Sequence, residues 1–259
     1  MQMQGINCGV RMAGAVVAVA ICTAAAPASI VDLVNNGSGS ANGALFFRAD
    51  FQPGGTGVLN PFVRIQHDNG PSNNGHSGNG LEQGYNTSGR PVQYDELTDP
   101  NYTRDLLFGE IPVVTIDGVQ YKEFILDINE PNGGIQALLS IDQINIYTSA
   151  TGGQTGLEST LGTIRYSLGA FLNDNTVTLD YDLNSGSGQG DMRMYIPLTN
   201  FAGVGANDFV YLYSHFGNLD DDHRTGDGFE EWSIIAIPAP GVLALLGVAG
   251  LVGSRRRRR

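Results

Sequence analysis

The sequence predicts an all-β protein, with a single β-sandwich or jelly-roll domain between an N-terminal signal peptide and a C-terminal apolar helix. Two observations predict this class. Apolar and polar residues alternate along the middle of the chain, and clusters of glycine, serine and asparagine separate the alternating segments. Apolar runs near both ends set the boundaries. We expect a signal peptide over 1–28, a β domain over 29–236 and a sorting signal over 237–259.

The first segment has the parts of a secretory signal peptide. Arg11 supplies positive charge, the run 12–26 is apolar and rich in small residues, and the Ala-Pro-Ala at 26–28 suits signal peptidase. A buried helix is the alternative, but the run passes at once into chain rich in Asn, Gly and Ser. Both cysteines, Cys8 and Cys22, lie in this segment. The domain that follows therefore has no disulfide and no cysteine ligand.

The clearest structure in the first half of the domain is a predicted hairpin. Segments 111–116 and 119–128 are rich in β-branched residues, and Asp117-Gly118 between them is a favoured two-residue hairpin turn. A Gly/Asn/Ser-rich segment over 69–80 is expected to be a mobile surface loop. Further strands are expected near 44–51, 61–66, 138–148, 160–168 and 229–236.

Three strands are predicted in the second half. Segment 176–183 alternates, which predicts a half-buried strand, and 208–216 is apolar on both faces, as in a central strand. Segment 191–196 places its apolar residues on one face. Trp232 in the last expected strand is assigned to the core. The residues expected to face inward are Val177, Leu179, Tyr181 and Leu183 in the first strand, and Met192, Met194 and Ile196 in the third.

The charge of the central region is strongly negative. All 26 acidic residues lie there, against eight of the 14 basic residues. Such a field repels phosphates and attracts divalent cations, so nucleic-acid binding is excluded. Solubility of a secreted protein is the simpler explanation of the negative charge.

The last segment combines proline, an apolar run and arginine. The run 242–253 is about a dozen residues long, shorter than the ~20 that span a bilayer comfortably. Arginine is costly in hydrocarbon, and basic residues stay on the cytoplasmic side. We therefore expect the tail to stop transiently in the inner membrane, with the arginines inside and the β domain outside. The residues of this signal are Pro238, Ala239, Pro240, Arg255, Arg256, Arg257, Arg258 and Arg259.

This arrangement resembles the PEP-CTERM sorting signal, in which a Pro-Glu-Pro motif precedes an apolar helix and an arginine cluster. Here the motif is the variant Pro238-Ala239-Pro240. The resemblance implies an integral-membrane exosortase, a cysteine-dependent transpeptidase-like enzyme, that cuts near the prolines. The product is then released or attached to extracellular polysaccharide. Segments 55–65, 82–87 and 227–232 also resemble exported proteins that carry the same tail, a likeness that implies no activity.

The densest acidic cluster in the sequence is a candidate calcium site. Calcium takes six to eight oxygen ligands, and Asp220, Asp222 and Asp227 could supply carboxylates from one loop. The EF-hand pattern fails, because its sixth position is Thr225 rather than glycine. The pattern over 180–191 fails in the same way, with Ser185 in the glycine position. A solvated acidic surface is the simpler interpretation of both clusters.

Catalytic motifs are not apparent. No histidine pair has metal-ligand spacing and no Gly-x-Ser-x-Gly elbow occurs, so we expect a protein that is not an enzyme and has no cofactor. With 26 acids, candidate glycosidase carboxylates such as Glu82, Glu123 and Glu230 arise by chance. Carbohydrate contacts could be made by Tyr85 and Tyr94, in loop-rich chain near amide side chains.

The leading expectation is a non-enzymatic, structural or adhesive protein of the cell surface or extracellular matrix. Its expected partners are signal peptidase, an exosortase-type membrane enzyme and extracellular polysaccharide. The alternative is a secreted polysaccharide-active hydrolase or carbohydrate-binding module.

Overall fold

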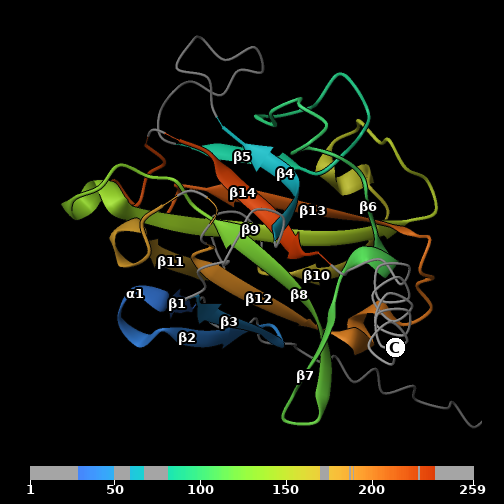
Figure 1. The fold of residues 1–259 in the computed structure, drawn as a ribbon, viewed down its shortest axis with the longest axis horizontal. Coiled ribbons are helices and arrows are strands. Elements are labelled where there is room, and N and C mark those ends of the chain that lie inside the picture. The colour runs from blue at the N-terminus through green and yellow to red at the C-terminus, as the bar shows by residue number, and fades with distance from the viewer. Residues whose placement is uncertain are drawn as a thin grey trace, which may run out of the picture.

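The computed structural model describes residues 29–49, 59–66, 81–169, 175–186, 188, 190–226 and 228–236. Strands make up 46% of the structure and helical residues 12%, which confirms the all-β class. The strands form two seven-stranded sheets (Figure 1). The predicted signal peptide, the loop over 69–80 and the sorting signal over 237–259 lie outside the described residues.

The first sheet is built around β9, its longest strand. Strand order is β1-β11-β9-β13-β5, with β10 added on β9 and β6 on β13. The β1–β11 pair is parallel, and the other pairs are antiparallel. The strands are β1 (Ile30–Asp32), β5 (Glu82–Tyr85), β6 (Leu106–Leu107), β9 (Leu138–Ser149), β10 (Thr163–Ser167), β11 (Thr176–Asp180) and β13 (Phe209–Phe216).

The second sheet has the order β2-β3-β12-β8-β14-β4, with β7 added on β8. All of its pairs are antiparallel. The last strand of the domain, β14, lies inside this sheet, between β8 and β4. The strands are β2 (Ser38–Ala41), β3 (Ala44–Arg48), β4 (Leu59–Ile65), β7 (Val113–Ile116), β8 (Val119–Asp127), β12 (Met192–Pro197) and β14 (Glu230–Ile235).

Helices are short in the described part of the chain. The α-helix α1 (Leu33–Asn36) begins at Asp32, whose carboxylate accepts the Asn35 N–H at 3.0 Å. It ends at Gly37, where a positive φ of 69° suits glycine. Single 3₁₀ turns lie at Phe108–Glu110, Gly134–Ala137, Glu158–Thr160, Tyr181–Leu183 and Leu198–Phe201.

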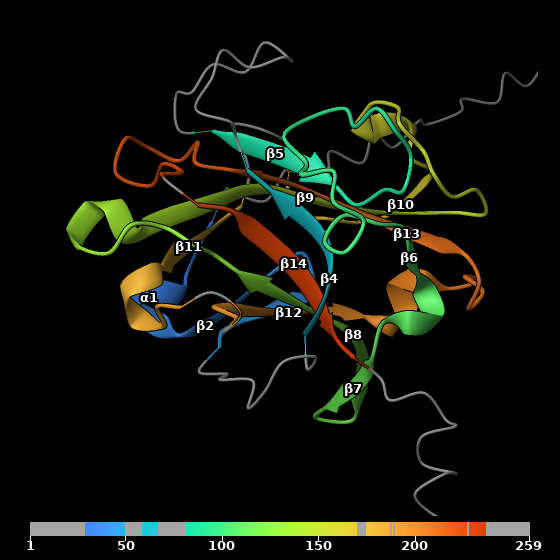
Figure 2. The same cartoon turned by 45° about the horizontal axis from the view of Figure 1, so that its top comes forward.

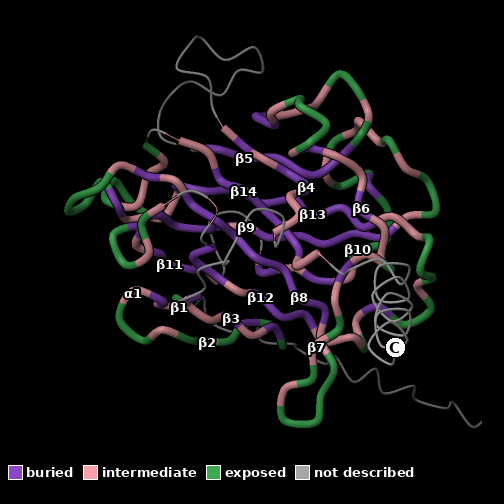
Figure 3. The backbone as a smooth tube through the Cα atoms, in the orientation of Figure 1, coloured by how far each residue is buried: buried purple, intermediate pink, exposed green. Residues whose placement is uncertain are grey.

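The two sheets pack against each other on one hydrophobic core (Figures 2 and 3). Both sheets contribute to it, with Phe216 and Ile146 from the first and Phe124 and Trp232 from the second. Trp232 is completely buried, as predicted, and its indole N–H donates to the Ser214 hydroxyl of the opposite sheet at 3.1 Å. The bond satisfies the one polar group of the indole inside the core.

The predicted hairpin is confirmed. Strands β7 and β8 pair in register from Ile116–Val119 outward. The turn residues Asp117 and Gly118 have φ angles of 49° and 82°, the left-handed pair that a type I′ turn requires. Val113 and Val119 are 48% and 46% exposed, so the hairpin extends beyond the core.

Two strand predictions for the second half hold and one fails in part. All three inward residues predicted for β12 are fully buried, and β13 is an internal strand of the first sheet. The predicted strand over 176–183 ends early, because the Asp180 carboxylate accepts the Asp182 N–H at 3.0 Å and starts a 3₁₀ turn. Leu183 is consequently 48% exposed. The outer threonines Thr176 and Thr178 are buried, so β11 is covered on both faces.

In the part of the chain that the structure describes, no helix has the length and apolar character needed to cross a membrane.

Candidate functional site

Two glutamates face each other from opposite sheets. Glu230 begins β14, two residues before Trp232, and therefore points to the same interior face. Its partner across the strand pair is Ile65, also a core residue. Glu82 begins β5 opposite the core residue Phe216, and directly opposed residues of an antiparallel pair share a face. Both carboxyl groups therefore lie between the sheets.

Glu130 is the third member of this group, which we call the carboxyl cluster (Glu82, Glu130 and Glu230). Glu130 follows the end of β8, and its Oε2 accepts the backbone N–H of Gly226 at 2.7 Å. Glu230 makes side-chain hydrogen bonds to both Glu82 and Glu130. The three residues are 4%, 4% and 1% exposed in sequence order. Three acidic side chains thus share one sealed space at this end of the two sheets.

The electrostatics of the cluster favour the protonated form of Glu230. Burial raises the pKa of Glu230 well above its ordinary value, and the charges of Glu82 and then Glu130 raise it further. Two carboxylates about 4 Å apart repel each other by about 4 kcal/mol even at an effective dielectric constant of 20. Two carboxyl oxygens in hydrogen-bonding contact also need a proton between them, because a carboxylate only accepts.

The three glycosidase candidates of the sequence do not form one site in the structure. Glu82 and Glu230 come together, but neither has the exposure that a sugar substrate would need. Glu123 lies apart from them, on β8. Its Oε1 accepts hydrogen bonds from the Arg193 guanidinium at 2.8 Å and from the Tyr195 hydroxyl at 2.9 Å. The contacts of Glu123 are those of a structural ion pair.

A further buried carboxyl, that of Asp191, lies beside the C-terminal end of β8. The Asp191 Oδ2 accepts the Ile128 N–H at 2.8 Å, whereas its Oδ1 is buried without a hydrogen-bond partner among the described residues. Burial raises the pKa of Asp191 to about 8; the Ile128 N–H lowers it and the nearby Asp127 charge raises it. Asp191 and Glu230 therefore both keep their protons to a higher pH than an exposed carboxyl does.

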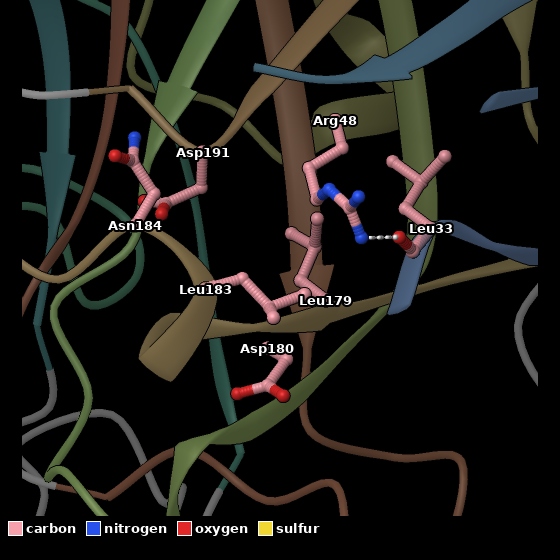
Figure 4. A pocket seen from close by; sticks show the side chains of 7 residues that line it. All are labelled: Leu33, Arg48, Leu179, Asp180, Leu183, Asn184 and Asp191. Carbon is pink, nitrogen blue, oxygen red and sulfur yellow. Dashed lines mark hydrogen bonds between the residues drawn. The ribbon is translucent and has the colours of Figure 1, made fainter. Parts of the chain in front are cut away.

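Asp191 also lines a small cavity of about 10 Å³ (Figure 4). Arg48 enters it from β3, and its guanidinium donates to the carbonyl oxygens of Leu33 and Val34 at 3.3 and 3.0 Å. These carbonyls belong to α1, whose last groups have no partner within the helix. A cavity of this volume is about the size of one water molecule, so it is too small for a substrate.

The proposed calcium ligands lie in an exposed loop. The Asp220 Oδ1 accepts from the Asp222 N–H at 3.0 Å and contacts the His223 ring nitrogen Nδ1 at 2.7 Å. The hydrogen bond from His223 lowers the pKa of Asp220. Asp222 is exposed, and Asp227 lies outside the described residues. Among the residues that the structure describes, no group of three or more His, Cys, Asp or Glu side chains could hold a metal ion.

The predicted sugar contacts belong to a second, smaller core on the first sheet. Tyr85 is in strand β5 rather than a loop and is completely buried. Its ring packs edge-on against Tyr94 at 6.0 Å and Tyr211 at 6.2 Å between centroids. Its hydroxyl donates to the Gly156 carbonyl at 2.8 Å. The Tyr85 ring therefore offers no face to a sugar, which corrects the expected surface position.

Tyr94 is half-buried beside this core. Its hydroxyl accepts the Glu158 N–H at 3.3 Å, and its ring also meets Tyr213 edge-on at 5.7 Å. These contacts fasten the connection after β9 to the sheet. The rings of this smaller core are those of Tyr85, Tyr94, Tyr147, Phe209, Tyr211 and Tyr213.

Beneath the tyrosines, Glu96 is buried in a different manner from Glu230. Its two carboxyl oxygens accept the backbone N–H groups of Tyr85 at 2.9 Å and Tyr94 at 2.8 Å. Burial raises the pKa of Glu96 to about 7, against the lowering effect of these donors. Glu96 therefore holds the loop after β5 against the strand.

The sequence offers Glu82 and Glu230 only as chance candidates and Asp191 only as the last position of the rejected calcium pattern over 180–191, and it does not single out Glu130 or Glu96. One signal was available for Glu230. A strand alternates with a period of two, so the assignment of Trp232 to the core also places Glu230 on the interior face. The sequence contains no comparable signal for the residues that meet it.

Comparison of the chain with family models, with curated proteins and with solved structures gives no match.

Proposed function

We propose that this protein is an exported structural or adhesive component of the cell surface or extracellular matrix, built as a β-sandwich and sorted through its C-terminal tail. The observation that carries the proposal is the order of features over 237–259: a Pro-Ala-Pro motif, a short apolar run and five arginines. A signal peptide over 1–28 is the matching expectation for export. Signal peptidase and an exosortase-type enzyme are the processing partners.

The position of β14 supports processing after folding. This strand ends at Ile235, shortly before Pro238, and it pairs with β8 and β4 on its two sides. Every strand of both sheets therefore precedes the proline motif in the sequence. Cleavage near Pro238–Pro240 would remove the tail and leave the core, including Trp232, intact.

The acidic body suits a soluble surface protein. Glu82 and Glu230, the glycosidase candidates that the fold brings together, are sealed from solvent, and the predicted sugar-binding ring of Tyr85 is covered. These observations favour a structural role over hydrolysis. Extracellular polysaccharide remains the partner proposed for the processed protein, through its processed end rather than through a sugar cleft.

The test replaces all five residues Arg255–Arg259 with serine. A serine tail has no charge to hold the apolar run at the cytoplasmic face, so we expect loss of processing while the β domain still folds. A five-lysine tail is the matched control, because it keeps the positive charge. Fractionation and mass spectrometry of the secreted form measure both. Normal export and cleavage of the serine variant would reject the proposal.

A further inference from the structure

The carboxyl cluster joins three segments that are distant from one another in the sequence. Glu82 belongs to the first sheet, Glu230 to the second, and Glu130 to the connection that leaves β8. Glu230 contacts both of the others through side-chain hydrogen bonds. We propose that the cluster is a proton-dependent latch, which joins the two sheets at this end when it is protonated and loosens them when it ionises.

The hydrogen bonds of the cluster explain why a proton is required. Carboxylates have no donor, so a bond between Glu230 and either neighbour exists only if one partner is protonated. The backbone N–H of Gly226 serves Glu130, but Glu230 Oε2 is buried with no hydrogen-bond partner among the described donors. Protonation supplies the missing donor within the cluster. Ionisation instead leaves like charges in contact, away from water.

The charged groups that surround the latch do not neutralise the charge that Glu230 would carry if it ionised. Glu82 on β5 and Glu130 after β8 are the groups that act on Glu230. On the neighbouring strands β13 and β9, His215 Nδ1 and Asp142 Oδ2 lie 4.0 Å apart as a pair of their own. On the opposite face of β14, Glu231 pairs with Arg64. The Arg64–Glu231 pair is balanced in charge, and His215 carries a charge only when it is protonated.

The sign of the pH effect follows from proton linkage. In the unfolded chain a glutamate loses its proton near pH 4.3, whereas burial and the neighbouring acids keep the pKa of Glu230 well above that in the fold. The folded state therefore binds more protons than the unfolded state between these two values. The contribution of Glu230 to the free energy of unfolding is therefore fully present below about pH 4, and it is lost as the pH rises through the folded pKa. The latch makes the domain more stable in acid.

The chain contains its own reporter for the test. Trp232 is the only tryptophan, lies two residues from Glu230 and is completely buried. Its fluorescence follows unfolding of this end of the molecule. The melting temperature, Tm, is measured between pH 4 and pH 9 on the purified full-length protein in mild detergent, with EDTA present.

The decisive variant is Glu230→Gln, which keeps the shape and hydrogen-bonding capacity of a protonated glutamate but cannot ionise. We expect the two proteins to melt within about 2 °C of each other at pH 4, and the variant to melt about 3–8 °C higher at pH 8. The control is Glu110→Gln, which removes the charge of a partly exposed acid outside the cluster that pairs with Arg104 and accepts the Leu107 N–H. Its Tm should follow the wild-type pH dependence.

The latch is overturned if Glu230→Gln melts with the pH dependence of the wild type. It is also overturned if added calcium, in place of EDTA, raises the Tm of the wild type at pH 8 but not that of the variant, because the cluster would then be a cation site. Should the variant fail to fold, NMR of ¹³C-labelled glutamate side chains in the wild type replaces it. A carboxyl assigned to Glu82, Glu130 or Glu230 that is still protonated at pH 6.5 supports the latch, and ionisation of all three at that pH rejects it. The signal of Glu96, whose pKa burial raises to about 7, is assigned separately and does not count.

Discussion

The carboxyl cluster and the acidic loop at Asp220–Asp222 are both groups of three acids, but they differ in almost every physical respect. The loop residues are neighbours in the sequence and lie in solvent, where the Asp221 side chain is 95% exposed. The cluster residues come from three distant segments and are at most 4% exposed. In the loop, a histidine contact lowers the pKa of Asp220, whereas burial raises that of Glu230.

This difference shows that the density of acids along a chain is a poor guide to their chemistry. A solvated carboxylate keeps its charge at little cost, and a salt bridge beside it contributes little. A buried carboxyl must be neutralised, paired or hydrogen-bonded, so its immediate neighbours decide its state. Replacing single acids by their amides tests this directly, because the same chemical change should have opposite signs at different sites.

The largest effect is expected at Asp191. Asp191→Asn removes a charge that burial disfavours and keeps an oxygen for the Ile128 N–H. Since the folded pKa is raised to about 8, the wild type loses stability as the pH rises from about 4 through 8. We expect the variant to be more stable than the wild type by about 2–4 kcal/mol at pH 9 and nearly equal at pH 4. Urea unfolding at both pH values measures this, and a variant that is less stable at pH 9 would contradict it.

An intermediate effect of opposite sign is expected at Glu96. Both of its oxygens accept backbone N–H groups, so Glu96→Gln turns an amide N–H₂ towards a donor. One buried N–H is left without an acceptor, and we expect a loss of about 1–3 kcal/mol at pH 5, where the raised pKa of about 7 keeps Glu96 protonated in the fold and the change removes no charge. Urea unfolding and hydrogen exchange of the Tyr85 and Tyr94 amides measure it. Unchanged protection of both amides would show that Glu96 does not hold this loop.

The smallest effect is expected at Asp221. Asp221→Asn removes the exposed, i,i+3 ion pair with Arg224, whose atoms lie 3.0 Å apart. We expect the free energy of unfolding to change by less than about 0.5 kcal/mol. The same denaturation experiment with and without calcium measures it. A loss above 1 kcal/mol only in the presence of calcium would restore the loop as a calcium site and remove the contrast with the cluster.

Much of the fold could be predicted because its signals are local. The Asp117-Gly118 turn and the one-sided pattern of β12 depend on neighbouring residues alone, and both agree with the structure. Trp232 was assigned to the core from the alternation of a single strand. Strand β11 was predicted only in part, because the cap at Asp180 ends it early and because β1 pairs with it along one edge.

The candidate site could not be predicted to the same extent. Strand β5 has no alternation, since all four of its residues are buried. The sequence therefore placed Tyr85 in a loop, with an exposed ring. The strand forms because β13 pairs with it, from Tyr213–Tyr85 to Phe216–Glu82. The paired strands are far apart in the sequence, so the pattern of a few neighbouring residues does not indicate that they pair.

The all-β class, the hairpin turn, the cysteine-free domain and the composition of the tail can be read from the residues alone, because each is a property of adjacent residues. It is the packing of the two sheets that brings Glu82, Glu130 and Glu230 into one sealed space and leaves Asp220–Asp222 in solvent. The physical reason is that the state of a carboxyl group depends on the solvent and charges within a few ångströms. Those neighbours are brought there by sheet pairing and packing, not by the order of the chain.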